Sequence, residues 1–147
     1  MENSTHSELN EFNCIYKEMG DLYHKISMKL GLSDSEFLIL YALVELNINR
    51  QKDIADYFFM SKQTVNSAVK KLIKSEIIEL RQSKDRDMQI IFTEMGENFA
   101  KEKLVPIINI EKDTFVTMGK TESQELLRLT RKHMEIFKEL INKHYLK

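Results

Sequence analysis

The stretch SKQTVNSAVKKLIKSEIIELRQSKDR, residues 61–86, decides the fold of this 147-residue chain. Ser61 can cap a helix here, because its hydroxyl accepts a hydrogen bond from an otherwise unpaired amide of the first turn. Apolar residues then recur at spacings of three and four, which predicts a helix with one buried face. That inner stripe consists of Val65, Ala68, Val69 and Leu72. The outer face is left polar and basic, with Lys62, Gln63, Asn66, Ser67, Lys70 and Lys71.

A short helix is expected before this one and a β-hairpin after it. QKDIADYFF (51–59) has an apolar stripe that makes it the first helix of a helix-turn-helix pair. IIEL (77–80) and MQIIF (88–92) are β-prone runs on either side of a polar loop. Residues 61–86 hold seven Lys or Arg and three Asp or Glu, so the segment carries +4 and the remainder −5 of the total −1. One basic patch on a mildly acidic protein is typical of a polyanion-binding surface.

Helices are also predicted toward the N-terminus. Thr5 and Glu8 read as a capping box that opens a first helix, which Gly31 closes. Ser33 and Glu36 form a second capping box before FLILYALVEL, a helix apolar nearly all round that must be buried on most sides.

The C-terminal third is predicted to hold two further helices. Thr93 can cap the first of them, and Pro106 should kink or break it, because proline lacks a backbone donor. Thr121 and Gln124 supply a third capping box, for a last helix that extends to about Tyr145. Its long apolar stripe exceeds what one small domain can cover, so a second copy of the chain is expected to pack there.

Composition narrows the class of protein. One Pro, four Gly and 42% hydrophobic residues indicate a mostly helical chain with a single core. No apolar run reaches the roughly 18 residues that span a bilayer, and the N-terminus lacks the pattern of a signal peptide, so we expect a cytoplasmic protein. Cys14 is the one cysteine, which excludes an internal disulfide.

Three segments, taken in order, resemble the MarR family of winged-helix transcriptional regulators. They are GLSDSEFLILYALVEL (31–46), QKDIADYFFMSKQTVNSAVKKLIKSEIIEL (51–80) and DRDMQIIFTEMGE (85–97). The resemblance implies a mostly α fold: a winged helix-turn-helix with a two-stranded β-wing and long N- and C-terminal dimerisation helices. It places the DNA-binding part at 33–93 and the dimerisation part at 1–31 and 94–147 of a single domain. The chain departs from the family at Glu76, where relatives usually carry Gly, and at the adjacent pair Asp85 and Arg86 of the wing tip.

The candidate DNA-contacting residues follow from the chemistry of the duplex. Gln63 and Asn66 carry paired donors and acceptors that match an adenine edge, whereas lysines suit phosphates. A guanidinium at a hairpin tip, here Arg86, is attracted by a narrow minor groove. The full set is Ser61, Lys62, Gln63, Thr64, Asn66, Ser67, Lys70, Lys71, Lys84 and Arg86. The alternative for each is a solvated surface side chain.

A second candidate site is suggested by relatives that respond to drugs or phenols. Aromatic side chains of the first two helices could line an effector cavity, or they could simply be core; they are Phe12, Tyr16, Tyr23, Phe37 and Tyr41. Cys14 could sense oxidants as in some relatives, but no neighbour favours its thiolate, and an inert thiol is the simpler interpretation. The four histidines show no metal-ligand spacing, and no catalytic motif or cofactor loop is present, so we expect neither a metal, a cofactor nor an enzyme.

The function expected is that of a homodimeric, sequence-specific double-stranded DNA-binding regulator. It would repress transcription from a pseudo-palindromic operator and be released by a small aromatic or amphipathic effector. The alternative is a winged-helix module that dimerises and binds protein partners without DNA. The two differ in salt dependence, because binding through several lysines weakens steeply as salt rises.

Overall fold

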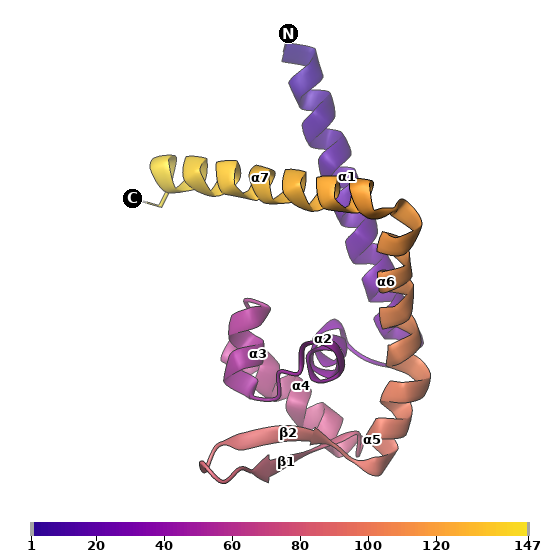
Figure 1. Cartoon of the computed structure of the whole chain (residues 1–147). Helices are drawn as coiled ribbons and strands as arrows, with labels where there is room; N and C mark the ends of the chain where they lie inside the picture. The colour runs from indigo at the N-terminus through magenta and orange to yellow at the C-terminus, as the bar shows by residue number, and fades with distance from the viewer. Residues whose placement is uncertain (1, 147) are drawn as a thin grey trace. The chain divides into compact units, whose positions relative to one another are not determined.

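The computed structural model describes the backbone of residues 2–146 and the side chains of residues 6–146. Over these residues the chain is helical apart from one two-stranded antiparallel sheet (Figure 1). It divides into two compact units, Met1–Val105 and Pro106–Lys147. The first unit contains a winged helix-turn-helix, as the sequence predicts.

The first helix, α1 (Glu2–Lys29), is longer than expected. It runs back to Glu2, so Thr5 lies inside the helix and the predicted Thr5–Glu8 capping box is wrong; the side chain of Thr5 lies outside the described residues. Gly31 ends the helix as predicted, with φ +72°. The amide of Leu32 donates to the carbonyl of Ser27 at 3.0 Å, which closes a left-handed C-terminal cap.

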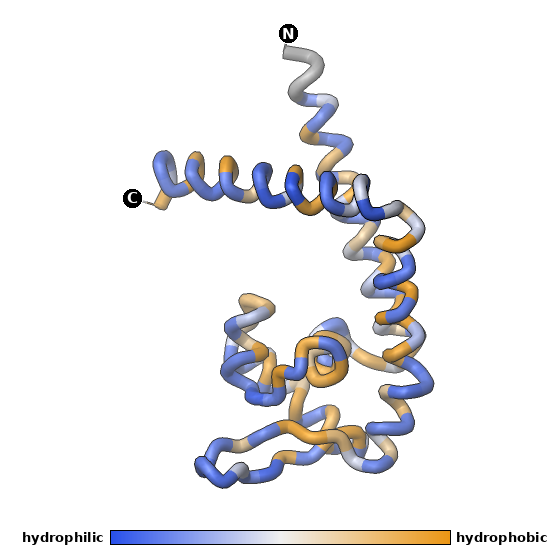
Figure 2. The backbone as a smooth tube through the Cα atoms, in the orientation of Figure 1, coloured by the Kyte–Doolittle hydropathy of each residue, from blue (hydrophilic) through white to orange (hydrophobic). Residues whose placement is uncertain are grey.

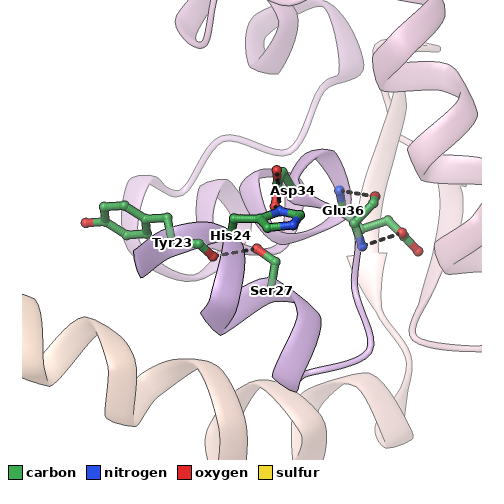
Figure 3. Close-up of polar contacts among 6 residues, drawn as sticks. Tyr23, His24, Ser27, Asp34 and Glu36 are labelled. Atoms are coloured by element: carbon green, nitrogen blue, oxygen red, sulfur yellow. Dashed lines mark hydrogen bonds and ion pairs between the residues drawn. The ribbon is translucent and has the colours of Figure 1, made fainter. Parts of the chain in front are cut away.

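The second helix, α2 (Asp34–Tyr41), starts at the predicted capping box. The Glu36 amide donates to Ser33 Oγ at 3.2 Å, and the Ser33 amide donates to Glu36 Oε2 at 2.9 Å (Figure 3). The helix continues as a π-helical turn, Ala42–Leu46, and stops at Asn47 in a left-handed conformation. Its buried side chains form the centre of the core of the first unit, so the prediction of a largely buried helix is confirmed.

The helix-turn-helix consists of α3 (Gln51–Tyr57) and α4 (Lys62–Lys74). Both α2 and α3 pack against α4. The predicted inner stripe of α4 is buried, and Ile54 and Ala55 of α3 are buried as well. Packing of these apolar faces fixes which side of α4 remains in solvent.

The wing is formed by β1 (Ile78–Gln82) and β2 (Met88–Phe92). Ile78 lies opposite Phe92, and Gln82 lies opposite Met88. The first strand extends two residues beyond the predicted 77–80 run. Ile78 and Ile90 are buried, so the root of the wing belongs to the same core as α4.

Thr93 caps the next helix, α5 (Glu94–Phe99), by accepting the amide of Gly96 at 3.0 Å. A π-helical turn, Ala100–Leu104, leads into α6 (Val105–Met118). The predicted irregularity at Pro106 therefore takes the form of a π turn. The wider turn lies immediately before the proline, where an ordinary helical hydrogen bond would be lost.

The second unit contains the remainder of α6 and the helix α7 (Lys120–His144). Gly119, with φ +85°, joins them, and α7 starts without a side-chain cap. Thr121 lies inside the helix, so the predicted Thr121–Gln124 capping box is wrong. Ser123 Oγ instead donates to the carbonyl of Phe115 at 2.8 Å. Among the described residues, no helix is both long and apolar enough to cross a bilayer.

Candidate nucleic-acid interface

The helix α4 separates its residues as the sequence predicts. Its inner stripe is almost completely buried, whereas every polar and basic residue expected on the outer face is exposed. At its start, Ser61 Oγ accepts the amide of Thr64 at 3.0 Å and lies 2.7 Å from Thr64 Oγ1. The two hydroxyls thus stabilise the first turn, and the side chains of the outer face lie beyond them, available to a ligand.

Shallow grooves are present along α4. One, of about 530 Å³, is lined by Gln51, Lys52, Lys62, Gln63 and Asn66. It brings the first turn of α3 next to the outer face of α4, so Gln51 and Lys52 join the candidate interface. Neither was predicted, although a search for cations at the start of the first helix of the pair would have found Lys52.

A second groove, of about 350 Å³, includes Gln63, Thr64, Ser67 and Lys71 together with serines from the start of α2. Amide and ammonium groups therefore line α4 in both grooves, and the second groove adds hydroxyl groups. These are groups that donate hydrogen bonds to phosphate oxygens and to base edges.

The wing tip, residues 83–87, is a tight turn that carries the predicted cations. The Ser83 amide donates to the Asp87 carbonyl at 2.8 Å, and the Arg86 amide donates to the Ser83 carbonyl at 3.0 Å. Arg86 has φ +64°, and both Arg86 and Lys84 are exposed. Figure 2 shows that the tip is largely hydrophilic. The turn thus projects two cations into solvent at the end of the hairpin.

The wing is tied to the segment that precedes α3, a connection that the sequence did not predict. Arg50 Nη1 lies 2.9 Å from Asp87 Oδ2, and the Ile90 amide donates to the Asn49 carbonyl at 2.7 Å. One contact is an ion pair and the other a backbone hydrogen bond, so the tip and the middle of β2 are both attached. Arg50 and Asp87 lie 37 positions apart, and no local pattern indicates that they meet.

The root of the wing depends on three residues. Glu76 has φ +59° and occupies the left-handed position that ends α4, with the Ile77 amide donating to the Leu72 carbonyl at 3.1 Å. Thr93 Oγ1 donates to the carbonyls of Glu76 and Ile77. A Cβ on Gly96 would lie 1.8 Å from the Ile77 carbonyl oxygen, so only glycine fits there. These contacts fix the angle at which the hairpin leaves the helix.

Ring contacts link three of the five aromatic residues proposed for an effector pocket. The ring centroids of Tyr23 and Phe37 are 6.3 Å apart, and those of Phe37 and Tyr41 are 6.1 Å apart. Phe12 and Tyr16 stack on each other, with ring centroids 6.3 Å apart, on an exposed part of α1. The structure thus assembles three of the five side chains where α1 meets α2.

Polar contacts lie near Tyr23, at the end of α1 and the start of α2 (Figure 3). His24 Nδ1 lies 3.1 Å from both carboxylate oxygens of Asp34, which joins α1 to the first turn of α2. The buried Ser27 hydroxyl donates to the Tyr23 carbonyl at 3.0 Å. The junction is therefore held by polar contacts as well as by rings.

Other candidate chemistry is sparse. Cys14 is exposed, and its Sγ lies 3.7 Å from Glu18 Oε1, so its polar neighbour is a carboxylate and not a cation. Among the described residues, no group of three or more His, Cys, Asp or Glu side chains is placed to hold a metal ion.

Comparison with known proteins gives a consistent family resemblance. Residues 30–86 match the model of the MarR family. The chain is similar to the MarR family regulator NMB1585 from Neisseria meningitidis, with 21% identity, a TM-score of 0.75, and coverage of 92% of this chain and 97% of that one. No curated protein sequence matches the chain.

Two similar structures contain bound molecules. The Staphylococcus aureus MepR–DNA complex is 19% identical, with a TM-score of 0.66 over 84% of this chain and 90% of that one. A Staphylococcus aureus MarR in complex with salicylate and kanamycin is 19% identical, with a TM-score of 0.62 over 95% of this chain and 93% of that one. At these identities the likeness establishes the fold.

Proposed function

We infer that this chain, which resembles the MarR family both in residues 30–86 and in its winged-helix fold, is a sequence-specific DNA-binding regulator of transcription. One observation carries the proposal. The helix α4 buries the stripe formed by Val65, Ala68, Val69 and Leu72. On the opposite face it exposes the amides of Gln63 and Asn66 together with lysines that include Lys62, Lys70 and Lys71. A short helix with that composition is what the major groove of duplex DNA admits and reads.

Each side chain of this face has a distinct role in the proposal. Gln63 and Asn66 lie on adjoining turns, line the same groove and offer a donor and an acceptor each to base edges. Lys62, Lys70 and Lys71 are point charges suited to phosphates, and Lys52 of α3 adds a fourth. Specificity would then come from the amides and most of the affinity from the lysines.

The wing supplies a second contact. Arg86 is exposed at the tip of the hairpin, where a narrow minor groove would attract its guanidinium. Lys84 adds a neighbouring charge. The Arg50–Asp87 ion pair and the bond from Ile90 to Asn49 support this role, because they hold the tip at a defined position in the unit that contains α4.

A homodimer is the assembly that we propose. In the first unit, α1 exposes Leu9, Ile15, Met19 and Leu22, and in the second α7 exposes an apolar stripe with no buried residue. Faces of this length are normally covered by protein, and a second copy offers identical, self-complementary surfaces. Residues 1–31 and 94–147 would thus be the dimerisation part and 33–93 the DNA-binding part. Two copies of α4 would read a pseudo-palindromic operator in successive major grooves.

Repression and release by an effector are the finer part of the proposal. A repressor needs only to occupy its operator, and a ligand that binds where α1 meets α2 could change how the DNA-binding parts are held. The aromatic cluster of Tyr23, Phe37 and Tyr41 suits a small aromatic or amphipathic molecule. The salicylate complex of a relative is consistent with such a ligand.

The test separates base reading from charge. A duplex selected from random sequences by the full-length protein serves as operator, with its scrambled sequence as control. Gln63→Ala or Asn66→Ala should weaken operator binding by about 1–3 kcal/mol and change binding to the scrambled duplex little. Lys70→Ala and Lys71→Ala should weaken both and lower the salt slope by about one unit each.

Two results would contradict the proposal. The first is a selection that enriches no DNA sequence, together with binding whose affinity does not change with salt concentration. This result would favour a protein-interaction module. The second is an equal loss of affinity by all four variants on both duplexes. In that case α4 would bind DNA only through its charge, and sequence would be read through DNA shape or by the wing.

A further inference from the structure

Phe59, in the turn between α3 and α4, is the most exposed large apolar side chain among the described residues. Its relative exposure is 97%, so the ring makes almost no contact within the chain. Removing an apolar ring from water is stabilising, and an exposed ring obtains that stabilisation only when another molecule covers it. The neighbouring Tyr57 differs, since its ring packs edge-on against Phe58 with centroids 4.9 Å apart.

The backbone at Phe59 is also unfavourable for its residue type. Its φ is +53°, in the left-handed region that disfavours side chains with a Cβ. The Met60 amide donates to the Ala55 carbonyl at 2.9 Å, the same cap that ends α1, where the left-handed position is held by Gly31. Glycine would satisfy the turn at residue 59 with less strain. Neither packing nor backbone geometry in the free chain therefore explains a phenylalanine.

The surroundings of the ring in the chain indicate what covers it. Phe59 lies two residues before Ser61, the cap of α4, and Lys62 and Gln63 follow in the first turn. Lys62 and Gln63 also line the groove beside α4. A single exposed ring, a few residues in sequence from a cation and an amide, matches a nucleotide, which combines phosphate with apolar groups. A hydrophobic protein groove would need a broader apolar patch.

We propose that Phe59 is a DNA-contacting residue whose ring packs on an apolar part of a nucleotide at the edge of the groove entered by α4. The apolar group is either a thymine methyl or a deoxyribose. This inference rests on the proposed function and adds to it a contact made by the turn of the helix-turn-helix motif. Strain at Phe59 is then retained because the ring is useful only in the complex.

The first test uses Phe59→Gly, which removes the ring and relaxes the turn. Its thermal midpoint should equal or exceed that of the wild type, while its affinity for the selected operator duplex should fall roughly tenfold. Operators with deoxyuridine in place of each thymine identify the contacted group. If the ring contacts a thymine methyl, replacing that one thymine should weaken binding of the wild type but not of Phe59→Gly. If the ring contacts a deoxyribose, no replacement should change the affinity of either protein.

The second test uses fluorescence. The chain has no tryptophan, so Phe59→Trp creates a single reporter. Its emission should be quenched or shifted by saturating operator DNA. Met95→Trp, on an exposed site of α5, is the control and should not respond.

The inference is overturned if Phe59→Gly binds the operator as tightly as the wild type while Lys70→Ala is weakened. An unchanged emission of a DNA-saturated Phe59→Trp protein, or a response only to an added protein partner, overturns it as well. If Lys70→Ala also binds as the wild type does, the proposed function itself fails, and the two failures are thereby distinguished.

Discussion

Replacing Gly96 with alanine tests whether the root of the wing is fixed by close backbone contact. An added Cβ would lie 1.8 Å from the Ile77 carbonyl oxygen and 3.1 Å from Cδ1 of Phe92. Carbon and oxygen that are not bonded approach to about 3.3 Å, so one backbone segment must move by about 1.5 Å. The Ile77 carbonyl cannot retreat freely, because it accepts the amide and the hydroxyl of Thr93.

The expected magnitude follows from these contacts. Overpacking of this kind destabilises by about 1–3 kcal/mol. Loss of one hydrogen bond to Ile77 adds about 1 kcal/mol. Alanine in place of glycine within a helix stabilises by about 0.5–1 kcal/mol, which offsets part of this loss. The net change for Gly96→Ala is a destabilisation of about 1–3.5 kcal/mol. At about 3 °C per kcal/mol for a chain of this length, the melting temperature should fall by about 3–10 °C.

The assay is urea denaturation followed by far-UV circular dichroism at one fixed protein concentration. Gly20→Ala is the matched control, because Gly20 lies in the middle of α1 and its added Cβ would have nothing within 4 Å. That variant should be more stable than the wild type by about 0.5–1 kcal/mol. Equal stabilities of the Gly96→Ala and Gly20→Ala variants would refute the reasoning.

Four further outcomes are expected. Glu76→Gly should raise the free energy of unfolding by about 1 kcal/mol in the same urea assay, because glycine adopts the left-handed cap without strain; a loss of stability would contradict this. Arg86→Ala should weaken operator binding by about 1–3 kcal/mol in a fluorescence-anisotropy titration while leaving the helix content unchanged, and unaltered affinity would remove the wing from DNA binding. Arg50→Asp and Asp87→Arg should each weaken operator binding several-fold through a displaced wing, and the double exchange should restore much of it; no recovery would mean that the pair does not position the tip. Sedimentation at micromolar concentration should show a dimer, and a stable monomer would exclude α1 and α7 as a dimer interface.

Local signals in the sequence were sufficient for most of the elements. The order of helices and strands, the burial of one face of α4, and the cap formed by Ser33 and Glu36 all follow from patterns within a few residues of each other. Such patterns determine a structure when neighbouring side chains alone satisfy the backbone.

Two predicted helix starts were wrong for the same reason. Thr5 and Thr121 have the right partner three residues later, but each lies inside a helix that begins earlier. A capping box is only one way to begin a helix, and a helix begins earlier when the residues before the box adopt helical geometry. At α7 the helix starts directly after Gly119, whose φ is +85°.

The missed features of the site depend on contacts between distant residues. Arg50 meets Asp87, Gln51 and Lys52 share a groove with α4, and Gly96 faces Ile77 only because the chain folds back on itself. The π turn before Asn47 was also not predicted, whereas the one before Pro106 takes the place of the predicted kink. The roles proposed for the individual residues of α4 and of the wing tip are predictions.

Four helical segments of the first unit end at a left-handed residue, and only α1 places glycine there. Two of the other three positions, Phe59 and Glu76, flank α4 on either side. Laboratory evolution for heat resistance, without any demand on DNA binding, should therefore return glycine at both positions. Under simultaneous selection for operator occupancy, glycine should return at 76 alone, and phenylalanine should persist at 59. The pattern of substitutions would thus show which of the two strained residues is kept because it contributes to DNA binding at a cost in stability.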